Sequence, residues 1–274
     1  MTVTAITSEF DDVADCPESV DSRPPSVLGK AHLLLEAFAS GSSTLGLTEL
    51  SRRSGVPKAS AHRLAVELVG LGLLAKTPQG YQLGWRIFEL GQLVPGPANL
   101  RAIAKPLLMD LRVAIRAVVH LAVPKGAETV YLERFAGQHE IASVNTVGHR
   151  VPSHTTASGM IFLAHGTPRA LADLPEDALT LLGLRDRTEL EERFAGIRGR
   201  RFAEEPRQCV PGLKTIAVPV MYPGTDQVIA AVSATMPVGR RDDQRVCHAL
   251  WTTAGDISRG IAGGPSRRNN RLAS

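Results

Sequence analysis

The chain has 274 residues, which is enough for two domains of ordinary size. Hydrophobic residues make up 43% and charged residues 21%, a globular balance, and no apolar run approaches the roughly 20 residues of a membrane helix. The three cysteines have no CxxC spacing, which argues against a disulfide framework or a paired-cysteine zinc site. A formal net charge of +4 is too small to indicate nucleic-acid binding by itself.

The two ends of the chain are polar. Residues 1–25 are acidic and end in two prolines, so we expect a disordered acidic arm there. This arm lacks the cationic start and apolar core of a signal peptide, which makes the cytoplasm the expected location. Residues 263–274 contain three arginines and predict a basic disordered tail.

Residues 26–84 have the pattern of a winged helix-turn-helix. Ser26 is a plausible N-cap for a helix whose apolar face holds Val27, Ala31, Leu34, Leu35 and Phe38. A second helix is expected from Thr48, whose hydroxyl can cap it, to Gly55. A third, 58–70, is expected to turn Ala61, Leu64, Leu68 and Leu71 inward. Short strands at 73–76 and 81–83 flank a Pro/Gly turn and predict a β-wing. A plain helical bundle is the alternative, and the caps, basic turn and wing in sequence argue against it.

The third helix carries the residues expected to read DNA. Only the first turns of a recognition helix reach base edges in the major groove, where small residues allow close approach and arginine can bind guanine or phosphate. The expected DNA-binding residues are Lys58, Ala59, Ser60, His62 and Arg63, with Thr48 and Lys76 beside them.

Residues 101–262 read as an α+β domain. Strands are expected at 117–123, 128–135 and 139–144, helices at 155–165, 188–198 and 242–261, with two alternating strands before the last helix. Alternation predicts one bulky face (Ile216, Val218, Val220, Val228, Val232, Met236) and one small, hydroxyl-bearing face (Leu213, Thr215, Ala217, Ala231, Ser233, Thr235). The second face suits the floor of a ligand pocket.

The helix expected from residue 155 follows a segment rich in hydroxyls. Free N–H groups at a helix start favour an anion, so a carboxylate effector is expected near His154 and Ser158. The alternative is structural: Thr155 or Ser158 only caps the helix, and His154 satisfies a buried carbonyl. Metal binding by His154, Glu205 and Cys209 is another alternative, although no metal or cofactor is expected.

Several runs together resemble the IclR family of bacterial regulators, over residues 26–262. They are GLTELSRRSGVPKASAHRLAVELVGLGLLAK, the wing end YQLG, VGHRVPSHTTASGMIFLAH, GLKTIAVPV and VIAAVSAT. The resemblance implies a winged helix-turn-helix (26–84), a linker helix (85–93, within a linker region 85–100) and a GAF-like antiparallel-sheet effector domain (101–262). It also implies effector-binding roles for Val151, Ala157, Ser158, Glu205, Thr215, Ser233 and Thr235. Met160 and Thr215 depart from the family pattern, which has Lys and usually Cys or Ser there.

These observations predict a transcriptional regulator, with repression favoured, that responds to an organic or aromatic acid. A homodimer or tetramer on a palindromic operator is expected, because one such helix buries too little surface to bind tightly alone. No membrane association is expected. No GxSxG elbow, Walker loop or HExxH motif is present. The rival classes are an enzyme with a DNA-binding tether, which turnover of a bound acid would reveal, and a ligand-independent DNA-binding protein.

Overall fold

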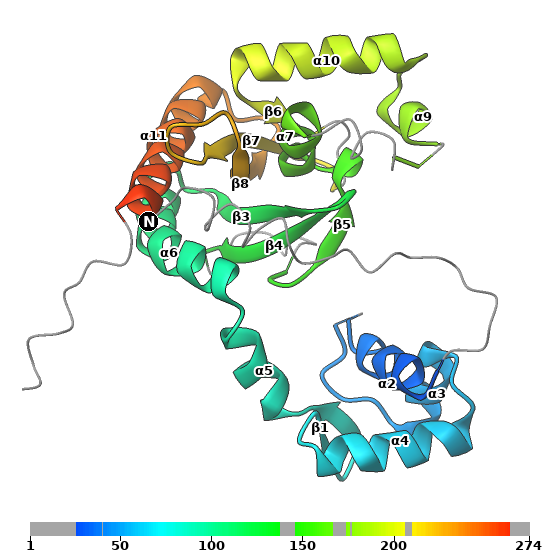
Figure 1. Ribbon diagram of the computed structural model, residues 1–274. Coiled ribbons are helices and arrows are strands. Elements are labelled where there is room, and N and C mark those ends of the chain that lie inside the picture. Colours follow the sequence, from blue (N-terminus) through cyan, green and yellow to red (C-terminus); the bar gives the residue numbers. More distant parts are fainter. Residues whose placement is uncertain are drawn as a thin grey trace, which may run out of the picture. The chain divides into compact units, whose positions relative to one another are not determined.

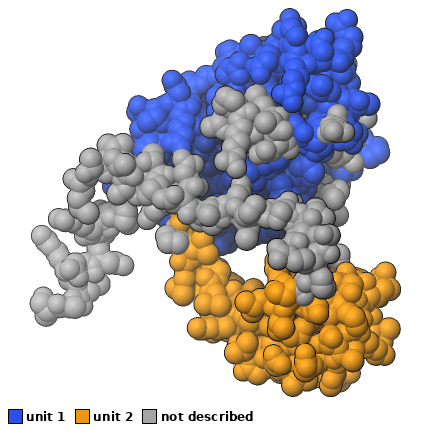
Figure 2. Space-filling model, turned by 45° about the vertical axis from the view of Figure 1, so that its right-hand side comes forward, with its two compact units in different colours: residues 1–10, 99–274 blue, residues 11–98 orange. Residues whose placement is uncertain are grey.

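The computed structural model describes residues 26–39, 41–137, 146–166, 174–175, 177–205 and 210–263. These residues fall into two compact units that meet in the chain between Ala98 and Asn99 (Figure 2). The N-terminal unit is the smaller one. Each unit has its own hydrophobic core.

The N-terminal unit is a winged helix-turn-helix, as expected. Its elements are α2 (Val27–Glu36), α3 (Leu47–Ser54), α4 (Lys58–Gly70), β1 (Leu74–Thr77), β2 (Gly80–Leu83) and α5 (Trp85–Gln92). Ser26 caps α2 by accepting a hydrogen bond from the Gly29 N–H at 3.0 Å, which confirms that prediction. The predicted linker helix corresponds to α5.

Three details of this unit differ from expectation. Thr48 does not cap α3, because the helix begins one residue earlier, with Gly46 in the N-cap position. Val27 is 60% exposed because it precedes the part of α2 that reaches the core at Leu34. Leu71 is 67% exposed: it ends α4, where Gly72 takes a left-handed φ of +73° and the chain leaves the helical path.

The C-terminal unit is built on one six-stranded antiparallel sheet with the order β5-β4-β3-β8-β7-β6 (Figure 1). Its strands are β3 (Val118–Lys125), β4 (Glu128–Phe135), β5 (Arg150–Pro152), β6 (Ala203–Glu204), β7 (Leu213–Met221) and β8 (Val228–Pro237). Its helices are α6 (Pro95–Ile115), the 3-10 turn η1 (Ser153–Thr155), α7 (Ala157–His165), α9 (Ala178–Leu182), α10 (Arg187–Arg200) and α11 (Asp243–Ala262).

Helices cover both faces of the sheet. One core joins α6 and α11 to the bulky side chains of the strands, including Ile216, Val218 and Val232. The other core joins α7 and α10 to small side chains such as Ala217 and Ala231. Figure 1 shows α6 and α11 together and α7 below α10. The predicted division into a bulky and a small face is therefore confirmed for these residues.

Other predictions for this unit have mixed outcomes. The strand 128–135 is observed with those bounds, whereas the strand predicted at 139–144 lies outside the described residues. The helix predicted from residue 155 begins at Ala157, after η1. Val228 was predicted on the bulky face, but it packs with the α7 core. The reason is a register irregularity between β7 and β8 at Val220/Met221, which changes the alternation at that end of the strand.

Candidate DNA-binding and effector-binding sites

The start of α4 presents the predicted recognition residues to solvent. Lys58, Ala59, His62 and Arg63 are exposed, and Ser60 is half-buried. On the opposite side of the helix, Ala61, Leu64, Ala65 and Leu68 are buried in the core of the unit. The polar side of α4 is thus free to enter a DNA groove, while its apolar side anchors the helix.

A charged cluster on α3 lies outside the predicted set. The Glu49 carboxylate accepts from Arg52 Nε at 2.8 Å and from Arg53 Nε at 2.6 Å. Hydrogen bonds from Arg52 and then Arg53 lower the pKa of Glu49 to about 2, so this carboxylate stays charged at neutral pH. The sequence indicates this cluster, because an acidic residue on a helix is followed three and four residues later by arginines. Thr48, predicted to bind DNA, is exposed beside this cluster.

Lys76 in the wing is held by Tyr81 of the neighbouring strand. Its ammonium lies 3.2 Å from the Tyr81 hydroxyl and 4.4 Å from the ring centroid. Tyr81 is fully buried and exchanges backbone hydrogen bonds with Leu45 at 2.8 and 2.9 Å. The close approach of the wing backbone to Leu45 requires glycine at position 80, because a Cβ there would lie 2.3 Å from the Leu45 carbonyl oxygen. The wing therefore presents Lys76 from a fixed position.

Three predicted effector residues form one hydrogen-bonded cluster. The Thr215 hydroxyl donates to Glu205 Oε2 at 3.1 Å and lies 3.0 Å from the Thr235 hydroxyl. Because the single hydroxyl hydrogen of Thr215 goes to the carboxylate, Thr235 donates to Thr215. Thr215 and Thr235 are register partners in β7 and β8. The sheet register thus brings together residues that the sequence separates widely.

Two further predicted polar residues lie at or just before the start of α7 and are buried. His154 is 3% exposed and Ser158 is 1% exposed. Neither His154 Nδ1 nor Ser158 Oγ has a hydrogen-bond partner among the described residues. Burial lowers the pKa of His154, and the charge of Asp177 opposes part of this shift. The lowered pKa keeps the imidazole neutral at pH 7.

The structural alternative for this segment is wrong about the residue that caps α7. Thr156, and neither Thr155 nor Ser158, caps α7, because its hydroxyl accepts from the Gly159 N–H at 3.0 Å. Thr155 instead donates to the Pro152 carbonyl at 2.7 Å. The turn lies against the helix only because position 159 is glycine: a Cβ there would lie 2.0 Å from the Ser153 carbonyl oxygen.

Val151 and Ala157 border the same region. Ala157 is buried in the α7 core, together with Ala217 and Ala231 of the sheet. Val151 is half-buried on β5, where it pairs with Thr129, and packs against the same core. The expected effector residues therefore surround one face of one sheet.

Two polar residues on this face were not predicted. His120 on β3 is 2% exposed and pairs with Ser233 on one side and with Arg134 on the other. It lies on the same face as Ala122, which belongs to the α7 core. The signal was a polar residue inside the otherwise apolar run 118–123. Arg134, His120 and Ser233 form a polar row across three strands.

A cavity of about 220 Å³ opens beside Glu205. Met160 of α7 lines it, at the position where the sequence departs from the family lysine, together with Arg193, Arg200 and Glu204. The proposed metal set of His154, Glu205 and Cys209 has one member outside the described residues. Within the described ranges, no group of three histidine, cysteine or acidic residues has metal-binding geometry.

The chain joins an exposed recognition helix and a wing to a sheet domain that holds buried unpaired polar groups. This combination defines a DNA-binding regulator with a ligand-binding domain. Two family models match: "IclR helix-turn-helix domain" over residues 27–78 and "Bacterial transcriptional regulator IclR C-terminal" over residues 94–259. The chain belongs to the IclR family of transcriptional regulators. No helix in the described part of the chain has the length and apolar character to cross a membrane.

Individual relatives agree with this assignment. The HTH-type transcriptional regulator XynR of Escherichia coli (strain K12) is 28% identical over 225 residues, which cover 80% of this chain and 89% of that protein. The transcriptional repressor IclR of the same strain is 25% identical over 221 residues, covering 78% and 79%. A crystal structure of an IclR homolog from Microbacterium hydrocarbonoxydans, complexed with 4-hydroxybenzoate, has a TM-score of 0.77, with 26% identity and coverage of 87% and 100%.

Proposed function

We propose that this protein represses transcription from a palindromic operator and that a small organic acid, aromatic in the favoured case, controls its DNA binding. The observation that carries the proposal is the pair of unpaired buried atoms, His154 Nδ1 and Ser158 Oγ. Leaving a buried polar atom without a hydrogen bond costs about 1–3 kcal/mol. A ligand that bonds to both atoms would therefore be bound more tightly, and it would stabilise the conformation that holds it.

A carboxylate fits this site better than a neutral polar group. The neutral imidazole of His154 can donate from Nδ1, the Ser158 hydroxyl can donate, and the first turn of α7 adds backbone N–H groups with the positive end of the helix dipole. The apolar body of the acid would lie toward the small side chains Ala217 and Ala231, which share the core of α7. The 4-hydroxybenzoate in the Microbacterium relative supports an aromatic acid.

The operator geometry rests on a dimer formed through α5. Trp85 is 72% exposed, Phe88 54% and Leu93 74%. The Trp85 and Phe88 rings contact each other with centroids 5.0 Å apart and planes tilted by 43°. An apolar helix face of this kind is suited to burial against a second copy. Two copies related by a two-fold axis would read two half-sites about one DNA turn apart. Trp85→Asp should yield monomers in sedimentation and weaken operator binding, whereas Arg187→Asp on the other unit should change neither.

The experiment that tests the proposal is operator binding with and without a panel of organic acids. We expect at least one acid to shift the operator Kd by about 5–150-fold, the range of ordinary allosteric coupling. A symmetric footprint on both half-sites is expected from the dimer. Operator binding that no acid changes would favour the ligand-independent alternative, and turnover of an acid would favour the enzyme alternative.

A further inference from the structure

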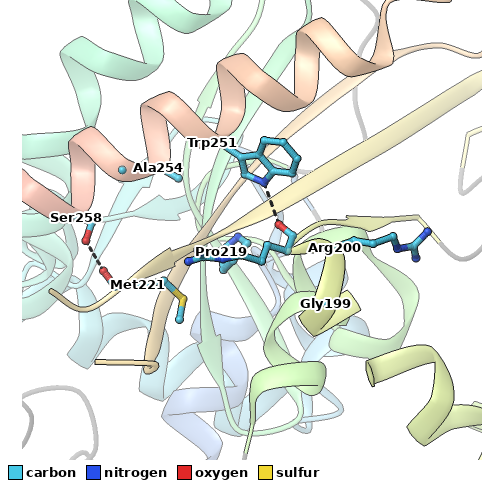
Figure 3. Close-up of a pocket in the computed structure, with 9 residues that line it drawn as sticks. Gly199, Arg200, Pro219, Met221, Trp251, Ala254 and Ser258 are labelled. Atoms are coloured by element: carbon cyan, nitrogen blue, oxygen red, sulfur yellow. Dashed lines mark hydrogen bonds between the residues drawn. The ribbon is translucent and has the colours of Figure 1, made fainter. Parts of the chain in front are cut away.

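A cavity larger than the one beside Glu205 lies between α11 and β7, away from the proposed effector site. It has a volume of about 460 Å³, which is within the range of small-molecule pockets, at about 300–1,000 Å³. Figure 3 shows Trp251 and Ser258 of α11 across from Pro219 and Met221 of β7. None of these residues has a role in the proposed effector site.

The cavity exists because β7 extends beyond its shorter neighbour, β6. β6 pairs only with Ile216 and Ala217, so among the described strands the last residues of β7 have a partner on the β8 side alone. Opposite β7, α11 lines the cavity with Ala254 and Gly255. A methyl group and a glycine are too small to fill the space. A Cβ on Gly255 would have only the end of the Arg259 side chain within 4 Å, at 3.4 Å.

The open edge of β7 is poorly suited to accept another strand. Pro219 has the same edge orientation as Ala217, and it has no N–H to donate. The Met221 carbonyl already accepts from the Ser258 hydroxyl at 2.7 Å. Because this edge lacks one donor and has one acceptor already occupied, the cavity favours a small molecule over an extended peptide.

The walls indicate the chemistry of that molecule. The Trp251 indole, the Pro219 ring and the Met221 thioether offer flat apolar surfaces. The Trp251 N–H is bonded to the Arg201 carbonyl at 3.0 Å, which fixes the indole. Arg200 and Arg201 are the charged residues that line the cavity, and no acidic residue lines it. In Figure 3 Arg200 extends away from Pro219 and Met221, which leaves Arg201 as the cation for a bound anion.

We propose that this cavity is a second ligand site, which binds a small aromatic molecule carrying one carboxylate. The ring would lie against Trp251 and Pro219, and the carboxylate would pair with Arg201. Arg200 lines both this cavity and the smaller one beside Glu205. The binding itself does not depend on the proposed function.

Labelling with 5-fluorotryptophan tests the site directly in the full chain, which has two tryptophans. Trp85→Phe assigns the two fluorine resonances, and Ser158→Leu closes the proposed effector site. In the Ser158→Leu background, benzoate should shift the Trp251 resonance in a saturable manner and leave that of Trp85 unchanged. Benzyl alcohol, which lacks the charge, and acetate, which lacks the ring, should bind at least about tenfold more weakly.

Matched variants locate the binding. Arg201→Gln should weaken benzoate at least about tenfold, and Gly255→Leu should abolish binding by filling the cavity. Gly255→Ala and Arg187→Gln should leave it unchanged. The proposal is overturned if benzoate gives no saturable shift, if benzyl alcohol binds equally well, or if Arg201→Gln has no effect. A Trp251 shift that follows protein concentration in place of benzoate would also overturn it, because a second copy would then cover the cavity.

Discussion

The recognition helix and the effector site are built in different ways. Every predicted DNA contact on α4 lies within six consecutive residues, and one helix positions them all. The effector residues come from β5, η1, α7, the residue after β6, β7 and β8, and they meet only through sheet register and the packing of α7. Substitutions at the exposed positions of α4 should therefore change DNA binding alone. Substitutions around α7 should also affect stability, depending on how closely the backbone packs there.

The largest expected effect is a loss of stability from a substitution at the effector site. Gly159→Val should lower the free energy of unfolding by about 3 kcal/mol, because the added side chain meets the Ser153 carbonyl oxygen. Gly196→Ala on α10 is the matched control. No atom lies within 4 Å of its added Cβ, so it should stabilise the protein by about 0.5–1 kcal/mol. Urea denaturation measures both, and equal stability of the two variants would contradict the close packing of η1 on α7.

On the DNA side, Arg63→Ala should cost about 1–3 kcal/mol of operator affinity if its guanidinium contacts a base. Lys58→Ala should weaken all sequences similarly and flatten the salt dependence by about one unit, as expected for one phosphate contact. Titration of operator and unrelated DNA at several salt concentrations separates the two. Both variants should unfold like the wild type, since both side chains are exposed. Unchanged operator affinity in the double variant would rule out α4 as the reading helix.

A smaller effect is expected within the hydroxyl cluster. Thr215→Val keeps the shape of the side chain but removes the hydrogen bonds to Glu205 and Thr235. Effector affinity should fall by about 1 kcal/mol, close to fivefold, with operator affinity unchanged. Thr252→Val, which removes an exposed hydroxyl on α11, is the control and should have no effect. Calorimetric titration with the responsive acid measures both variants.

The smallest effect is a pH dependence of stability. Burial lowers the pKa of His154 in the folded state, so the unfolded chain takes up this proton first as the pH falls below about 6.5. Stability should therefore fall between about pH 7 and pH 5, and the slope should be shallower in His154→Gln. Unfolding free energies at the two pH values give the comparison, and His62→Gln, at an exposed position, controls for an ordinary histidine. Identical slopes in His154→Gln and the wild type would show that this imidazole is not desolvated.

The same contrast explains what could be predicted from the sequence. The helix-turn-helix and the exposure of Lys58 and Arg63 follow from local periodicity, which one stretch of chain determines. The clustering of Thr215 with Thr235 depended on register, and alternation predicted their shared face. His120 was missed although it is a polar residue inside the apolar run 118–123, because only the register of β3 against β8 places it beside Ser233. Arg134 was missed because the pairing of β3 with β4 includes an irregularity at Leu121/Ala122 that alternation cannot reveal. The capping role of Thr156 was assigned to its neighbours because η1 precedes α7 and delays its start.

The most direct test of the account compares Ser158→Leu with Arg63→Ala in one experiment, measuring acid binding by calorimetry and operator binding for each. Ser158→Leu should lose acid binding and acid response while retaining wild-type operator affinity without acid. Arg63→Ala should lose operator affinity while binding the acid normally. The account would be contradicted if Ser158→Leu bound the acid and responded to it like the wild type, because the buried unpaired groups at the start of α7 would then not be the effector site.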